Sequence, residues 1–179
     1  MPNLEKIHEI EAAANKARDK FADFKKKTLE DPTLSAHGKQ KRIDERHEAI
    51  VETLTELRQT YAKIIDETEG RLKDAAFPTP TGSDAMAYDH YVFEMSRGEI
   101  TPAERLSRLE QAGSDNTRKA LAKSAFIAGD YSTLEAFAKL KGDAKEINSF
   151  LQFRRDYGTG KSRRAKFSES MLFRAPSKK

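Results

Sequence analysis

A heptad pattern of apolar residues runs through the first half of this chain in two stretches. Between residues 4 and 24 the apolar positions recur at steps of three and four, which lines one face of a helix. Between residues 43 and 68 they follow the alternating four-three spacing of a coiled-coil seam. These positions are Leu4, Ile7, Ile10, Ala14, Ala17, Phe21 and Phe24, then Ile43, His47, Ile50, Leu54, Leu57, Tyr61, Ile64 and Thr68.

A turn is expected between the two stretches. Pro32 disfavours the helical conformation at Asp31, and Ser35 is suited to cap the start of a second helix. The two helices should therefore fold back antiparallel as a hairpin. This register pairs Phe24 with Ile43, Phe21 with His47, Ala17 with Ile50, Ala14 with Leu54, Ile10 with Leu57 and Ile7 with Tyr61. Small alanines then face large aliphatic residues, which should fill the seam without a void.

The second helix is longer than the first, so its last turns need another partner. Ile65, Leu72 and Phe77 lie in this overhang, which either the second half of the chain or a neighbouring subunit must cover. Two prolines and a glycine follow within residues 77–83 and indicate a semi-rigid connector.

The second half shows patterns of short helices and no convincing strand. Residues 84–95 are apolar all round and are expected to form its core. Thr101 followed by Pro102 indicates a capped helix start, and Gly129 indicates a helix end. The predicted fold is all-α, with a long antiparallel coiled-coil helical hairpin, a compact bundle of short helices and a basic C-terminal tail. The predicted segments are 1–76 for the hairpin, 77–83 for the linker, 84–157 for the bundle and 158–179 for the tail.

Charge is distributed unevenly along the chain. The net charge is +4, but from residue 154 onward nine basic residues stand against two acidic ones, giving +7 there and leaving −3 for the preceding part. Aromatic residues are interleaved with these cations. We therefore expect the binding residues to be Arg154, Arg155, Tyr157, Lys161, Arg163, Arg164, Lys166, Phe167, Phe173 and Arg174.

Three interpretations of this basic region are open. It can dock onto an acidic protein surface, with cations steering and aromatics anchoring. It can contact phosphates and stack on bases, or it can be a disordered, solubilising end. If it is an arm, removing residues 158–179 should leave helicity and melting temperature nearly unchanged.

No catalytic or metal-binding constellation is predicted. Residues 158–162 end like a phosphate-binding loop, but Arg155 stands where that loop needs a glycine and no strand precedes it. His90 and Glu94 form only a pair, whereas a stable metal site needs three or four ligands. The chain has no cysteine, and its carboxylates are spread along helix faces. The sequence therefore predicts a protein that is not an enzyme and has no cofactor, metal or membrane partner.

The run 29–43, which joins two long charged helices, resembles the hairpin turn of small helical proteins of tailed bacteriophages. The segment 120–131 is similar to the compact part that follows a proline-containing linker in those proteins. The resemblance covers about the first three quarters of the chain. It implies a virion or head-morphogenesis role, as a scaffold-like or minor structural protein.

This role implies a non-enzymatic assembly protein that binds a larger protein assembly, such as a capsid or other virion protein, or itself. The chain would be oligomeric or lattice-bound, in the host cytoplasm during assembly or in the virion. Phage scaffolds tend to be acidic, whereas this chain has a pI near 9.2, so a component retained in the particle is equally open. The alternative function is binding of DNA through the basic tail.

Overall fold

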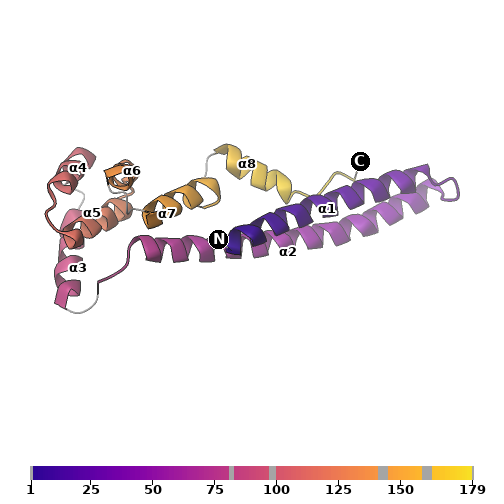
Figure 1. Ribbon diagram of the computed structural model, residues 1–179. Coiled ribbons are helices and arrows are strands. Elements are labelled where there is room, and N and C mark those ends of the chain that lie inside the picture. Colours follow the sequence, from indigo (N-terminus) through magenta and orange to yellow (C-terminus); the bar gives the residue numbers. More distant parts are fainter. Residues whose placement is uncertain (1, 81–82, 97–99, 141–144, 159–162, 179) are drawn as a thin grey trace. The chain divides into compact units, whose positions relative to one another are not determined.

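A computed structural model describes residues 2–80, 83–96, 100–140, 145–158 and 163–178. In these ranges the chain forms eight α-helices and no strand (Figure 1), which confirms the all-α prediction. None of the described helices is both long and apolar enough to cross a membrane.

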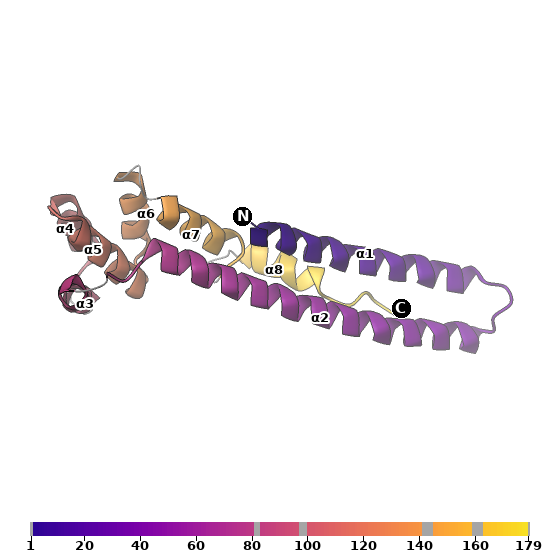
Figure 2. The ribbon, with the colours of Figure 1, turned by 60° about the horizontal axis from the view of Figure 1, so that its bottom comes forward.

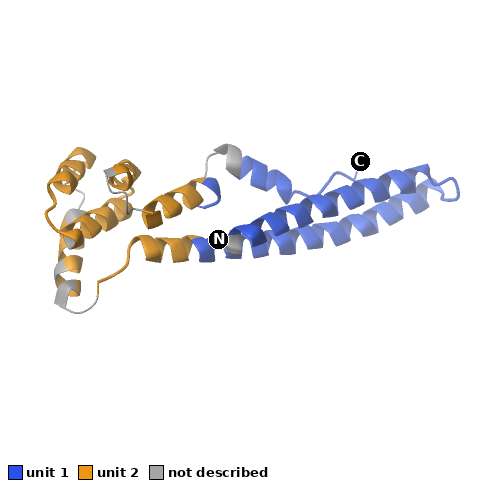
Figure 3. Ribbon diagram, viewed as in Figure 1, with its two compact units in different colours: residues 1–68, 156–179 blue, residues 69–155 orange. Residues whose placement is uncertain are grey.

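The chain divides into two compact units (Figure 3). Unit 1 consists of residues 1–68 and 156–179, and unit 2 consists of residues 69–155. This division differs from the four predicted segments, because the last part of the chain joins the first two helices in one unit.

Unit 1 is built on two long helices, α1 (Pro2–Glu30) and α2 (Ala36–Ala76), of which α2 contributes residues 36–68. They lie side by side and run in opposite directions (Figures 1 and 2). Most of the predicted seam positions are buried, namely Ile7, Ile10, Ala14, Phe21, Ile43, Ile50, Leu54, Tyr61 and Thr68. The predicted pairing of Phe21 with His47 is confirmed, since their ring centroids are 5.7 Å apart.

The turn between α1 and α2 is held by local hydrogen bonds. The Asp31 carboxylate accepts hydrogen bonds from the backbone N–H of Thr33 at 2.9 Å and from the Thr33 hydroxyl at 2.6 Å. These bonds lower the pKa of Asp31. The Ser35 hydroxyl accepts from the backbone N–H of Gly38 at 3.2 Å, which confirms the predicted cap at the start of α2.

Unit 2 contains the helices α3 (Ser83–Ser96), α4 (Pro102–Gln111), α5 (Asp115–Ile127) and α6 (Tyr131–Leu140), and α7 (Lys145–Asp156) up to residue 155. Its core is centred on Leu121, Leu134 and Phe150, each fully buried. The end of α2 packs into this core through Leu72 and Phe77. Unit 2 thus covers Leu72 and Phe77 of the predicted overhang, and Phe77 is a core residue rather than part of a linker.

The prediction that residues 84–95 form the core of the second half holds for only one face of the helix. Tyr88 and Val92 on α3 are buried, but the side chains of Met86 and Phe93 are 86% and 60% exposed. The helix packs one face against α5 and leaves the other open, because the small unit cannot enclose it on all sides.

The predicted start of α4 and the predicted end of α5 are both found in the structure. The Thr101 hydroxyl accepts from the backbone N–H of Glu104 at 3.3 Å, with Pro102 in the first turn. Gly129 has a φ of 70°, a left-handed conformation that glycine adopts at low cost, and it turns the chain from α5 into α6.

A buried ion pair joins α4 to the start of α6. Arg105 Nη1 lies 3.4 Å from Asp130 Oδ2, and both side chains are about 5% exposed or less. The Asp130 carboxylate also accepts hydrogen bonds from the hydroxyl groups of Ser132 and Thr133, both at 2.6 Å. The Asp130 carboxylate therefore has two roles: it caps α6, and it neutralises the buried guanidinium of Arg105.

Candidate functional site

The basic C-terminal region is folded onto α1 and α2 within unit 1. Residues 163–172 form a helix, α8 (Arg163–Leu172), and residues 173–178 continue as an extended segment, here called the C-terminal segment. Figures 1 and 2 together show α8 and this segment along one side of the α1–α2 pair.

Main-chain carbonyl groups of this region are bound by side chains of α1 and α2. Arg18 donates to the carbonyl of Met171 at 2.9 Å, and Lys25 donates to the carbonyl of Ser177 at 3.3 Å. His47 Nε2 lies 3.0 Å from the carbonyl oxygen of Pro176. The predicted seam histidine thus has a second role, holding the C-terminal segment.

An aromatic contact and an ion pair add to these bonds. Phe173 is 8% exposed, and its ring centroid lies 5.1 Å from that of Tyr61. Lys178 Nζ lies 3.2 Å from the Asp44 carboxylate. Hydrogen bonds from Lys178 and Gln40 lower the pKa of Asp44. The C-terminal segment is therefore part of the folded unit 1.

The predicted binding residues lie in different surroundings. In unit 2, Arg154 is half-buried, pairs with Glu69 at 3.3 Å and stacks on the ring of Tyr131, while Arg155 is exposed. In unit 1, the Tyr157 hydroxyl lies 3.0 Å from His8 Nε2, and Phe173 is buried. Lys166, Phe167 and Arg174 are exposed, Arg163 and Arg164 lie in the first turn of α8, and Lys161 lies outside the described residues.

Helix α8 presents apolar side chains to solvent. Phe167 is 66% exposed and Met171 is 36% exposed. They are four residues apart and therefore lie on the same side of the helix. We call Lys166, Phe167 and Met171 the α8 surface.

An acidic groove of about 320 Å³ lies beside α8 in unit 1. Tyr61 and Tyr157 line it together with three carboxylates, those of Glu11, Asp156 and Glu169. Burial, followed by the charge of Glu11, raises the pKa of both tyrosines. The Tyr61 hydroxyl donates a hydrogen bond to Glu11 at 3.2 Å.

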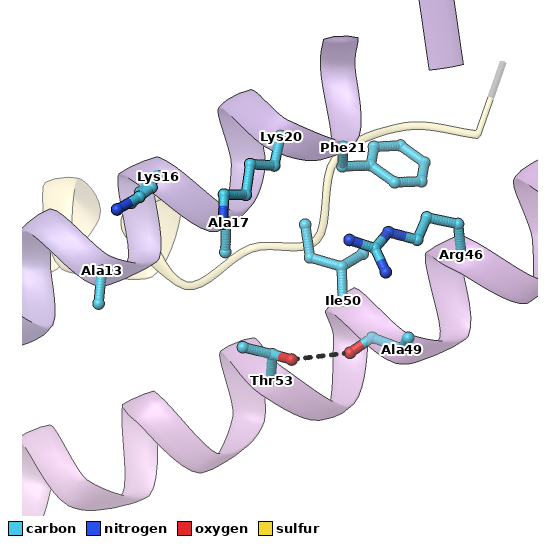
Figure 4. Close-up of a pocket in the computed structure, with 9 residues that line it drawn as sticks. All are labelled: Ala13, Lys16, Ala17, Lys20, Phe21, Arg46, Ala49, Ile50 and Thr53. Atoms are coloured by element: carbon cyan, nitrogen blue, oxygen red, sulfur yellow. Dashed lines mark hydrogen bonds between the residues drawn. The ribbon is translucent and has the colours of Figure 1, made fainter. Parts of the chain in front are cut away.

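A second groove, of about 340 Å³, lies between α1 and α2 (Figure 4). Ala13, Lys16, Ala17, Lys20 and Phe21 line it from α1, and Arg46, Ala49, Ile50 and Thr53 line it from α2. Ala17 and Ile50, which the predicted register pairs, both line this groove, and the short alanine side chains leave it open to solvent. We call it the cationic groove, since its three charged lining residues are all basic.

No protein-family model, curated protein or solved structure matches this chain. In the part of the chain that the structure describes, no three or more His, Cys, Asp or Glu residues are grouped so that they could hold a metal ion.

Sequence reasoning missed the cationic groove and the anchoring role of Phe173. Ala13, Lys16 and Lys20 recur at helical spacing, and this signal was available in the sequence. Phe173 gave no such signal, since its contact partner Tyr61 lies far away in the sequence.

The position of Phe173 changes the expected effect of altering this region. Phe173→Ala should lower the free energy of unfolding of unit 1 by about 1.5–3 kcal/mol, the value of burying one large apolar side chain. It should also increase hydrogen exchange in α8, which loses its anchor. Denaturant unfolding and exchange mass spectrometry measure both effects.

Phe167→Ala is the matched control, because it removes the same side chain from an exposed position of the same region. Its effect should stay within about 0.5 kcal/mol. Equal stability of the two variants would show that the C-terminal segment does not anchor α8.

Proposed function

We propose that this protein is a non-enzymatic structural or assembly protein that binds a larger protein assembly. The observation that carries this proposal is the α8 surface, where an aromatic ring and a thioether are exposed beside a cation. Exposed apolar residues surrounded by charge are typical of protein interaction sites. The resemblance of residues 29–43 and 120–131 to phage proteins suggests that the assembly is a virion or its head precursor.

The anchored C-terminal segment supports this function through preorganisation. Phe173 and the bonds from Arg18 and His47 hold the segment that follows α8. When a partner binds Phe167, helix α8 then loses little conformational entropy, because it is already ordered. Binding is therefore stronger at a given contact area. In this proposal α1 and α2 act as a coiled-coil spacer. When many copies bind the same lattice, their overall affinity for it rises because each bound copy increases the effective concentration of the next contact.

Binding of DNA is the second candidate, and the exposed cations favour it. Lys166 and Arg174 are exposed near Phe167, and cations next to an accessible aromatic ring suit single-stranded nucleic acid. We rank it second because three predicted binding residues have contacts within the protein: Arg154, Tyr157 and Phe173.

A photo-reactive phenylalanine analogue in place of Phe167 tests the proposal. In cells that produce the assembly, irradiation should link position 167 to one protein of a large particle, which mass spectrometry identifies. The same analogue in place of Phe93, also exposed but on α3, is the control and should not give this adduct. An adduct with nucleic acid instead would favour the second candidate, and no adduct specific to position 167 would reject the α8 surface as a binding site.

A further inference from the structure

The cationic groove lies on the side of α1 and α2 that the C-terminal segment leaves uncovered. Arg18, which holds the segment, is two residues from both Lys16 and Lys20, which line the groove. Asp44, which pairs with Lys178, is likewise two residues from Arg46. Two residues turn an α-helix by about 200°, so the groove and the C-terminal segment lie on opposite sides.

The groove has an apolar floor, and three of its lining residues are alanines. Ala13, Ala17 and Ala49 contribute only methyl groups, and Ile50 and Phe21 are buried beneath them. Small side chains allow another helix to approach to the usual interaxial distance of about 8–10 Å. The groove therefore has room for a helix of a second molecule.

Both helices contribute cations to the groove, Lys16 and Lys20 from α1 and Arg46 from α2, and a row of carboxylates lies beside it on α2. On α1, Lys16 and Lys20 line it and are exposed. On α2, a single stripe at helical spacing contains Glu45, Ala49, Glu52 and Glu56, all exposed. Because Ala49 lines the groove, the three carboxylates of this stripe lie along its α2 edge.

The lysines of α1 and the carboxylates beside the groove on α2 are complementary between two copies of the chain. A two-fold axis parallel to the helices would place the Lys16 and Lys20 side of one copy over the acidic stripe of the other, twice in each dimer. A two-fold axis perpendicular to the helices would instead place lysines over lysines. Charge complementarity therefore favours one relative orientation of two copies.

We propose that two copies of this chain associate through the cationic groove, with α1 of each copy packed on α2 of the other. The groove would then be the inner face of a four-helix arrangement, and Lys16 and Lys20 would pair with Glu45 and Glu52 of the other copy. This inference does not rest on the proposed function of α8, which lies on the opposite side of the two helices.

A charge exchange between two variants tests the proposal. Variant A carries Lys16→Glu and Lys20→Glu, and variant B carries Glu45→Lys and Glu52→Lys. In either homodimer both contacts would join like charges, so the dissociation constant should rise about tenfold or more. Mixing A with B restores opposite charges at both contacts, and a one-to-one heterodimer should form. Light scattering on gel-filtered protein measures the masses, and a tag on one variant identifies the heterodimer.

A matched control separates the groove from net charge. Lys26→Glu with Arg58→Glu changes the charge by the same amount as variant A, at exposed positions away from the groove. This variant should dimerise like the unmodified chain, and circular dichroism should show the same helicity for all variants. A monomeric unmodified chain, unchanged dimerisation of variants A and B, or failure of the mixture to form a heterodimer would each overturn the proposal. Loss of cross-linking at position 167 would leave it intact.

Discussion

Replacing Leu54 with alanine should lower the free energy of unfolding of unit 1 by about 2–5 kcal/mol. Leu54 is 1% exposed and packs at the centre of the seam between α1 and α2. The substitution loses the transfer free energy of the side chain and leaves a cavity that two long helices can close only partly. Urea unfolding followed by circular dichroism measures the change.

Val51→Ala provides the comparison on the same helix. Val51 is 39% exposed, so its truncation should change stability by about 0.5 kcal/mol or less. Leu57 is half-buried, and Leu57→Ala should fall between the two. Sequence periodicity alone assigns Leu54 and Leu57 the same cost. If Leu54→Ala and Val51→Ala unfold at the same urea concentration, the seam does not hold the two helices together.

Asp130→Ala should destabilise unit 2 by about 3–5 kcal/mol, because it leaves the buried Arg105 guanidinium without its carboxylate. It also removes the acceptor for Ser132 and Thr133 at the start of α6. Thermal unfolding of the purified chain measures this loss, and hydrogen exchange should locate it between residues 100 and 140.

The Glu104–Arg108 pair is the control for this experiment. Its charged atoms are 2.7 Å apart, closer than the 3.4 Å between Arg105 and Asp130, but both of its side chains are at least 40% exposed. Water screens an exposed pair, so Glu104→Ala should cost about 1 kcal/mol or less. If Glu104→Ala lowered the stability of unit 2 as much as Asp130→Ala, burial would not be what makes the Arg105–Asp130 pair important.

The same carboxylate gives unit 2 a defined acid sensitivity. Burial alone would raise the pKa of Asp130, but hydrogen bonds from Ser132, Thr133 and Arg105 outweigh it and hold the pKa below the usual value. A lowered pKa in the folded state means that the stabilisation is present above the unfolded pKa of about 3.9 and is lost as the pH falls through the folded value. Asp130→Ala should therefore be less acid-sensitive than the unmodified chain.

Sequence patterns predicted those features of the fold that depend on neighbours in the chain. The caps at Ser35 and Thr101 are local hydrogen bonds, and the seam around Leu54 follows from helical periodicity. The exposed face of α3 was not predictable in this way. Met86 and Phe93 are apolar, and only the number of helices around them decides that they stay exposed.

The candidate binding surfaces were predicted only in part. Local composition identified Lys166 and Phe167, which the structure shows as exposed. It could not separate them from Phe173, because that ring packs against Tyr61 of α2, which lies far away in the sequence. The cationic groove depends on the space left between two helices, which heptad spacing does not specify.

The division of unit 1 into two chain segments has a consequence for how the protein reaches its native state. Contacts that close unit 1 join residues 149 and 153 positions apart, whereas the Arg105–Asp130 pair spans 25. Contacts between near neighbours form faster, so unit 2 should fold before unit 1 closes. A folded unit 2 also removes most of the freely moving chain between residues 68 and 156, which lowers the entropic cost of closure. In this order of folding, the inserted unit should help the surrounding unit to close, because it shortens the loop between the two segments of unit 1.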